Sequence, residues 1–400
     1  MKLTLHIGTR KTGTTSIQAF LRKNRKILFE NGIFVLDYLS LNQYEFALAA
    51  DISHNLKYYI EEIQKISGYD FNEYSGDYYQ KLQKELNALP EHIDHVIVSS
   101  EDCSLLDNNS IIYLKNKLSS YFEIVEIISY FRRQDRYVTS NVTTALRSGY
   151  RVKLNNIFNT SDIQHLLYNE MMTNWANSFG KKNITCRVFE KEKLINNDLI
   201  IDFLNIANIK SIENLDMSRI STNESIDIIT ARCIEVYNNS DILSNELGYS
   251  RNELIKKINN KSESKFLPAR NEAIKFQSIF MEENKNFMIN FFEGHLQLFN
   301  NIFDEYPEVL PKQDYIDEKS LQHLLQHLIS EEKKSFEYMK TINTLNENVE
   351  FLNNLAKRYE ILGDNTTTLS ILKICQVIRP NGEYINKKIK KIMESLNEHD

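Results

Sequence analysis

Eight residues near the beginning of the chain, Gly8-Thr-Arg-Lys-Thr-Gly13-Thr-Thr, have the glycine spacing of a phosphate-binding loop, G-x-x-x-x-G. A nucleotide triphosphatase carries Lys-Ser or Lys-Thr directly after the second glycine, because the lysine reaches the β- and γ-phosphates and the hydroxyl binds magnesium. This chain has Thr14 and Thr15 at those positions, and its lysine, Lys11, lies inside the loop. The spacing therefore predicts an anion site whose lysine serves a different chemistry.

The flanking residues predict that this loop joins a strand to a helix. Residues 3–7 are an apolar run typical of a buried strand, and residues 16 to about 30 have helical spacing, with Thr14 or Thr15 as the cap. In such a loop several backbone N–H groups point at one spot, and the helix N-terminus adds positive potential. We expect Gly13 to let the backbone approach a phosphate, and Lys11 to lie over that phosphate and its outer substituent.

A second basic segment follows the predicted strand at residues 124–128. Arg132 stands near the end of this strand, and Ser140 lies eight residues later in a predicted helix, 134–147. An arginine fork suits a phosphate, and a hydroxyl further along the helix can close the pocket. The alternative is that the arginines here are a solvated helix start, although cations at a helix N-terminus oppose its dipole and favour a nearby anion.

The two segments together resemble the signatures of sulfotransferases that use 3′-phosphoadenosine 5′-phosphosulfate (PAPS). Their phosphosulfate loop has the form (P/R)K-(T/S)-G-T-T, and HIGTRKTGTTSIQAFL is similar to the opening of the bacterial carbohydrate-type members. Arg132 and Ser140 match the family's 3′-phosphate signature. The resemblance covers roughly residues 3–300, and looser matches follow at Arg187 to Glu190, Asp202, residues 223–225 and Asn284.

What the resemblance implies is a P-loop fold that binds PAPS as sulfuryl donor and releases adenosine 3′,5′-bisphosphate (PAP). It implies no metal, and a hydroxyl or amine of a glycan or related molecule as acceptor. The donor would be bound by Arg10, Lys11, Thr12, Gly13, Thr14, Thr15, Arg132 and Ser140.

The transfer chemistry needs a cation on the leaving group and a base on the acceptor. In-line attack on sulfur spreads charge over the departing oxygens, so Lys11 is expected to neutralise the leaving phosphate. Glu101 follows the predicted strand 96–98, and open parallel sheets bind ligands beyond the carboxyl ends of their strands. A partly desolvated Glu101 would have a raised pKa and accept the proton. Alternatively, Glu101 caps the next segment or pairs with an arginine; Asp102 and His95 are weaker candidates for the base.

Alternating strands and helices predict an α/β fold, a three-layer arrangement around a central parallel sheet. We expect further strands at 33–36 and 184–189, and helices over 42–89, 110–120 and 166–179, with polar turns near residues 68–76. From about residue 222 onward only helical patterns are seen. His6 is expected to pack inside its strand, and Trp175 is assigned to the core.

The C-terminal segment differs from the rest. Its residues fall at the spacings of one tetratricopeptide repeat, namely Ala356, Tyr359, Gly363 with Asp364, Leu369, Cys375 and Pro380, with Cys375 at a position for a small residue. Because one repeat cannot bury a solenoid core alone, residues 318–345 are expected to supply another helix pair. We therefore divide the chain into a sulfotransferase-type domain, 1–310, and a small α-helical module, 311–400. The helices of that module are expected to offer a surface for a protein partner or self-association.

Composition limits the class of protein. The net charge is −6 and the isoelectric point is about 5.9, which argues against a general nucleic-acid or anionic-membrane binder. The four cysteines are far apart, no apolar run is long enough for a membrane span, and no signal peptide precedes the first strand. These features predict a cytoplasmic protein. His323 and His327 lie four apart without a third ligand nearby, which favours a plain helix face over a metal site.

Two other functions stay open at this point. A kinase or triphosphatase is suggested by HVIVSSED, an apolar strand that ends in an acid suited to magnesium, although two serines interrupt it and the loop lysine is displaced. The other alternative is a non-catalytic interaction protein that uses its C-terminal helices.

Overall fold

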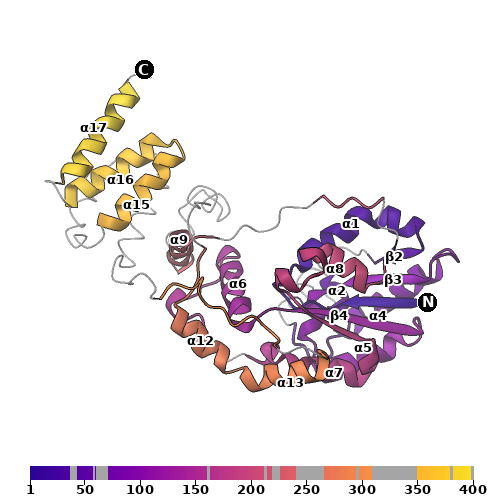
Figure 1. Ribbon diagram of the computed structural model, residues 1–400. Coiled ribbons are helices and arrows are strands. Elements are labelled where there is room, and N and C mark those ends of the chain that lie inside the picture. Colours follow the sequence, from indigo (N-terminus) through magenta and orange to yellow (C-terminus); the bar gives the residue numbers. More distant parts are fainter. Residues whose placement is uncertain are drawn as a thin grey trace. The chain divides into compact units, whose positions relative to one another are not determined.

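The computed structural model describes residues 1–36, 43–56, 59, 71–159, 163–210, 214–218, 226–239, 265–293, 297–308, 349–378 and 382–397 (Figure 1). The chain forms two compact units. The first comprises Met1–Tyr137, Thr160–Glu224 and Lys275–Ile302, and the second comprises Val138–Asn159, Ser225–Ile274 and Phe303–Asp400. The predicted division near residue 310 stays a prediction.

A five-stranded sheet of parallel strands is the centre of the first unit, in the order β2-β3-β1-β4-β5. The strands are β1 (Lys2–His6), β2 (Ile33–Val35), β3 (His95–Ser99), β4 (Ile124–Phe131) and β5 (Ile184–Val188). β1 lies between β3 and β4, with Leu3 opposite Val96 on one side and Val125 on the other. The prediction of an α/β fold with a central parallel sheet is confirmed.

Helices cover both faces of this sheet because alternate residues of its strands point to opposite sides. Leu3 and Leu5 belong to a core that is shared with α4 (Phe71–Asn87), α5 (Asn108–Leu118) and α7 (Tyr168–Phe179), in which the expected core residue Trp175 is fully buried. Ile97 and Ile128 pack on the other side against α1 (Thr14–Glu30) and α8 (Leu199–Ile206). Figure 1 shows α1 and α8 on one side of the strands and α5 and α7 on the other.

Two local predictions were wrong. A turn was expected to extend to Gly76, but this glycine lies inside α4, where a Cβ would meet no atom within 4 Å. The helix after the loop begins at Thr14 rather than at residue 16, and neither threonine caps it. Its N-cap is Gly13, which has no side chain to form a capping bond, and the hydroxyl of Thr14 is bonded elsewhere.

The second unit is built from helices around one apolar core. α9 (Ile228–Asn239) shares this core with α15 (Val349–Ile361), α16 (Asn365–Ile378) and α17 (Glu383–Asn397). Ala356 and Cys375, the two small residues of the predicted repeat, are fully buried where α15 and α16 pack. A buried ion pair, with Arg358 Nη1 2.8 Å from Asp227 Oδ1, ties α15 to the residues before α9. Helical structure is confirmed here, whereas the tetratricopeptide assignment and the helix pair at 318–345, outside the described residues, stay predictions.

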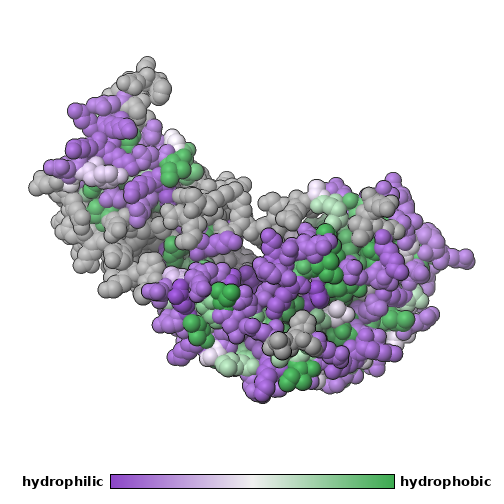
Figure 2. All heavy atoms as spheres, viewed as in Figure 1, coloured by the Kyte–Doolittle hydropathy of each residue, from purple (hydrophilic) through white to green (hydrophobic). Residues whose placement is uncertain are grey.

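On the face that Figure 2 shows, the described residues are mainly hydrophilic. Figure 2 shows small hydrophobic areas that are separated by hydrophilic side chains. No helix among the described residues is long and apolar enough to cross a bilayer. The four cysteines are buried and free.

Candidate functional site

The predicted phosphate loop lies at the carboxyl end of the sheet, between β1 and α1. Its first part is tied to β4: the backbone N–H of Thr9 donates to the carbonyl of Tyr130 over 2.8 Å, and the Thr9 hydroxyl donates to the same oxygen over 3.1 Å. β1 connects toward β2 at one edge of the sheet, whereas β4 connects to β5 at the other edge. The loop therefore stands at the point where the connections diverge, which is where open α/β sheets bind ligands.

Gly13 is needed for its conformation and for its surroundings. Its φ is +81°, in the left-handed region, and a Cβ built on it would lie 2.4 Å from Leu199 Cδ2 and 3.2 Å from Phe189 Cε2. α8 and the end of β5 thus press on the loop from the side. The Thr12 hydroxyl donates to the carbonyl of Thr9 and closes the turn from within.

Three predicted cations come together at this loop. Arg132, directly after β4, places Nη1 3.3 Å from the carbonyl oxygen of Lys11. Burial lowers the pKa of Lys11, and the charges of Arg10 and Arg132 lower it further, against the opposing effect of Glu101. Such mutual repulsion at the N-terminus of a helix is relieved by a bound anion.

Glu101 stands next to the cations, at the carboxyl end of β3, the neighbour of β1. It is the first residue of the short helix η1 (Glu101–Leu105), and a Cβ on Gly8 would lie 3.1 Å from its Cα and Cβ. The hydroxyl of Thr14 donates to Glu101 Oε2. Burial raises the pKa of Glu101 and Asp102 adds to this, whereas the Thr14 bond and the charges of Arg10 and Lys11 act against it. The structure therefore brings the expected base to the expected loop.

Asp102 has a different role from its neighbour. Its carboxylate is buried, and Arg10 donates to it from Nε over 3.0 Å and from Nη2. Burial opposes the charge on Arg10, but Asp102 more than offsets this and raises the pKa of Arg10. Tyr59 lies close by, where burial and Asp102 raise its pKa to about 12. The pairing with arginine that was considered for Glu101 is thus made by Asp102, which is engaged rather than available as a base.

Arg133 and Ser140, which belong to the same basic segment as Arg132, have different surroundings. Arg133 is buried and pairs with Asp135, two residues further along the chain, with Nε 2.7 Å from Oδ1. It also donates to the carbonyls of Asn300 and Ile302. It therefore has an anion within the fold and secures the chain near residue 300. Ser140 lies further along α6 (Gln134–Arg147) in residues assigned to the second unit, so its predicted contact with the 3′-phosphate stays a prediction, as does that of the half-buried Thr15.

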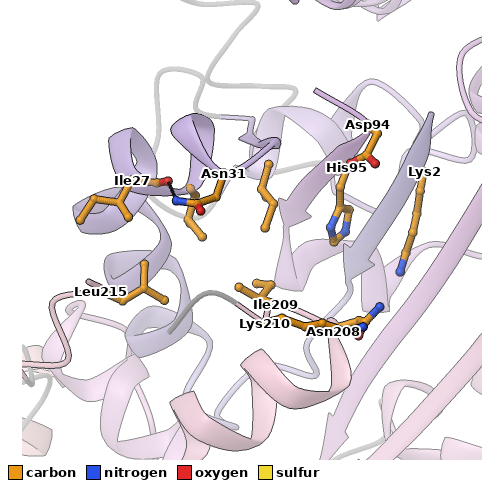
Figure 3. Close-up of a pocket in the computed structure, with 11 residues that line it drawn as sticks. Lys2, Ile27, Asn31, Asp94, His95, Asn208, Ile209, Lys210 and Leu215 are labelled. Carbon is orange, nitrogen blue, oxygen red and sulfur yellow. Dashed lines mark hydrogen bonds between the residues drawn. The ribbon is translucent and has the colours of Figure 1, made fainter. Parts of the chain in front are cut away.

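The two histidines of the sheet form hydrogen bonds inside the fold. His6 is fully buried, as predicted, with Nδ1 2.8 Å from the Ser99 hydroxyl. His95 begins β3, at the opposite end from Glu101, and its Nε2 is 2.8 Å from the Thr4 hydroxyl. It lines a cavity of about 340 Å³ at the amino ends of the strands, beside Lys2 and Asp94 (Figure 3). His95 is therefore excluded as the base, and this cavity contains none of the predicted site residues.

The looser sequence matches have structural roles where the structure describes them. Arg187 of β5 donates from Nε to Asp202 of α8 over 3.1 Å, and Tyr130 donates to the same carboxylate over 2.8 Å. Asn284 exchanges hydrogen bonds with Gln134 at the start of α6. Residues 223–225 and His323 with His327 lie outside the described residues.

Sequence reasoning missed the side chains that shape the loop. Phe189 and Leu199 press on Gly13, and Tyr168 donates to the carbonyl of Arg132 over 2.8 Å. Phe189 carried a usable signal, because it is the last residue of a predicted strand and so had to lie at the ligand-binding edge of the sheet. For Leu199, Tyr168 and Tyr59 we find no comparable signal in the sequence.

Comparisons with known proteins give little further information. No family model matches the chain, and no solved structure matches it. It is 25% identical over 258 residues to an uncharacterized protein of Archaeoglobus fulgidus, a match that spans 61% of this chain and 66% of that protein. The name of that relative assigns no activity. Among the described residues no three His, Cys, Asp or Glu side chains are grouped to hold a metal ion.

Proposed function

We propose that this protein transfers a sulfuryl group from PAPS to a hydroxyl or amine of a glycan acceptor. The observation that carries the proposal is the meeting of Arg10, Lys11 and Arg132 with the partly buried carboxylate of Glu101 at one loop. Cations and helix N–H groups suit the anionic donor, and the carboxylate suits the proton that leaves the acceptor. The resemblance of RKTGTT to the phosphosulfate loop selects sulfuryl transfer from the chemistries that such a site would allow.

The loop would hold the 5′-phosphosulfate, with N–H groups and Thr14 on the phosphate and Lys11 beside the bridging oxygen. The acceptor oxygen forms a bond to sulfur on the side opposite that bridging oxygen, and the bond between sulfur and the bridging oxygen breaks. Its electron pair remains on the 5′-phosphate of PAP, where the Lys11 ammonium neutralises it. Arg132 would hold the 3′-phosphate through its guanidinium fork. No step of this scheme requires a metal ion.

Glu101 would take the proton of the acceptor hydroxyl. A carboxylate is an effective base when its pKa lies near the working pH, and burial moves the pKa of Glu101 in that direction. Its position supports the role, because it projects from the strand next to the loop and touches Thr14. Asp102 is unsuited to the same task because its carboxylate already pairs with Arg10.

Two measurements test the proposal. PAPS with ³⁵S-labelled sulfate should pass its label to members of a sugar panel, with the mass of the product raised by one sulfuryl group, and Lys11→Ala should abolish most of the transfer. In a thermal-shift assay, PAP without metal should stabilise the protein, whereas ATP with magnesium should not. Stabilisation by magnesium–ATP, with indifference to PAP, would instead identify a kinase or triphosphatase.

A further inference from the structure

One contact in the site conflicts with the proposed binding of the donor. Thr14 is the first residue of α1 and follows the loop glycine, so its hydroxyl is a donor that an anion in the loop needs. In this structure the hydroxyl donates to Glu101 instead. A threonine hydroxyl has a single proton to donate. It therefore serves either the carboxylate or the phosphate, but not both.

The groups around Glu101 hold its carboxylate at the loop, in the place of an external anion. Glu101 packs against the backbone at Gly8 on one side, and Lys11 and Arg10 of the loop attract its charge. Asp102, from its own helix, repels it. Tyr59 is a further titratable group that senses its charge. The carboxylate thus offers the loop one negative charge and one hydrogen-bond acceptor, as the phosphate of a donor would.

We infer that the Thr14 hydroxyl changes acceptor when the donor binds, moving from Glu101 to the 5′-phosphate and so releasing the base. The inference rests on the proposed function. Hydrogen bonding to a carboxylate favours its charged form and weakens it as a base, and the Thr14 bond acts in that direction here. Releasing the bond strengthens Glu101 when the donor is in place. Without donor, the base remains occupied by Thr14.

A double-mutant cycle on ligand binding tests this exchange. Thr14→Val, Glu101→Gln and the double variant are titrated calorimetrically with PAP and, separately, with inorganic pyrophosphate. Glu101→Gln should bind the anion about tenfold more tightly, because a competing charge is gone. In the parent, Thr14→Val should lower the affinity for the anion about twofold, because there the hydroxyl exchanges one charged hydrogen bond for another. In Glu101→Gln the bond that the hydroxyl gives up is neutral, so Thr14→Val should lower the affinity about five- to tenfold.

The controls separate this exchange from simple repulsion. Glu126→Gln removes an equal charge at the opposite end of the sheet, where Glu126 pairs with Lys2 over 2.7 Å, and it should leave the affinity unchanged. Equal effects of Thr14→Val in the two backgrounds would overturn the exchange, whatever the affinity of Glu101→Gln. Circular dichroism checks that each variant is folded, and Thr14→Ser, which keeps the hydroxyl, should behave as the parent.

The probes also separate this inference from the function on which it rests. Pyrophosphate binding without any preference for PAP would reject the sulfotransferase proposal. The double-mutant cycle measured with pyrophosphate would still show whether the Thr14 hydroxyl changes acceptor. PAP binding with an additive cycle would reject the exchange alone. Failure of the parent to bind either anion would reject both.

Discussion

Lys11 is expected to reduce the stability of the protein while serving its chemistry. Its φ is +65°, a left-handed conformation that is unfavourable for a side chain with a Cβ. It is also partly buried beside Arg10 and Arg132, and its pKa is lowered by that burial and by those charges. Replacing Lys11 with methionine, which has a similar length and no charge, should therefore stabilise the fold and impair sulfuryl transfer.

The magnitude has two parts that different variants separate. Lys11→Met removes only the charge. Removing an unfavourable group from a functional site usually raises the free energy of unfolding by about 0.5–2 kcal/mol. Lys11→Gly also removes the left-handed strain, which costs roughly 1–2 kcal/mol. Glycine offsets about 0.5–1 kcal/mol of this gain, because it increases the conformational entropy of the unfolded chain. Both should lower turnover by about 100- to 1,000-fold, the usual effect of removing one group that stabilises developing charge.

Urea unfolding and labelled-sulfate transfer measure the two effects on the same samples.

The pH dependence of the stability gained by Lys11→Met has a defined sign. Because the folded pKa of Lys11 lies below its ordinary value of 10.5, its charge penalises the folded state fully at pH values below the folded pKa, and this penalty is lost as pH rises from the folded pKa to 10.5. The advantage of Lys11→Met should shrink there. Lys26→Met, at an exposed position of α1, is the matched control. A methionine variant that is less stable than the parent, or that keeps turnover within threefold, would refute this reasoning.

Three further changes have defined outcomes. Arg132→Ala should weaken PAP binding about tenfold or more with a smaller change in kcat, as measured by calorimetry and steady-state kinetics. Gly13→Ala should destabilise the protein by about 1–3 kcal/mol in urea, because its Cβ would lie 2.4 Å from Leu199 Cδ2 at a φ of +81°, and Leu199→Ala should restore part of the loss. Glu101→Gln should raise the melting temperature at pH 8 but not at pH 4. The raised pKa of Glu101 gives stability at low pH that the parent loses as pH rises through the folded pKa. Equal melting temperatures of the parent and Glu101→Gln at pH 8 would contradict this prediction.

Local patterns predicted those parts of the site that lie within one strand–turn–helix segment. The loop after β1 and Arg132 after β4 were found because glycine spacing, apolar runs and charge at a helix start are readable over a few residues. The first threonine was misread for the same reason. A threonine at a helix start usually caps it, and nothing local shows that Glu101, which is 87 residues away, takes its hydroxyl.

Adjacent acids in the sequence were harder to assign than the loop. Glu101 and Asp102 are neighbours at the end of one strand, yet Asp102 is buried against Arg10 and Glu101 reaches Thr14. Which acid meets which partner depends on the path of η1, a five-residue turn that no periodicity marks. The sequence therefore predicted a carboxylate at this edge of the sheet and left open a pair between Glu101 and an arginine, whereas the structure shows a pair between Asp102 and Arg10.

The order of the strands explains why these residues form one site. With β3 and β4 on either side of β1, the acid that follows β3 and the arginine that follows β4 both lie one strand from the loop. Neighbouring strands are about 4.8 Å apart, so moving β3 outward by one position would place Glu101 roughly 10 Å from β1. A hydrogen bond between Thr14 and Glu101 would then be out of reach. The chemistry proposed for this protein thus depends on a long-range pairing, Leu3 with Val96, as much as on the loop itself.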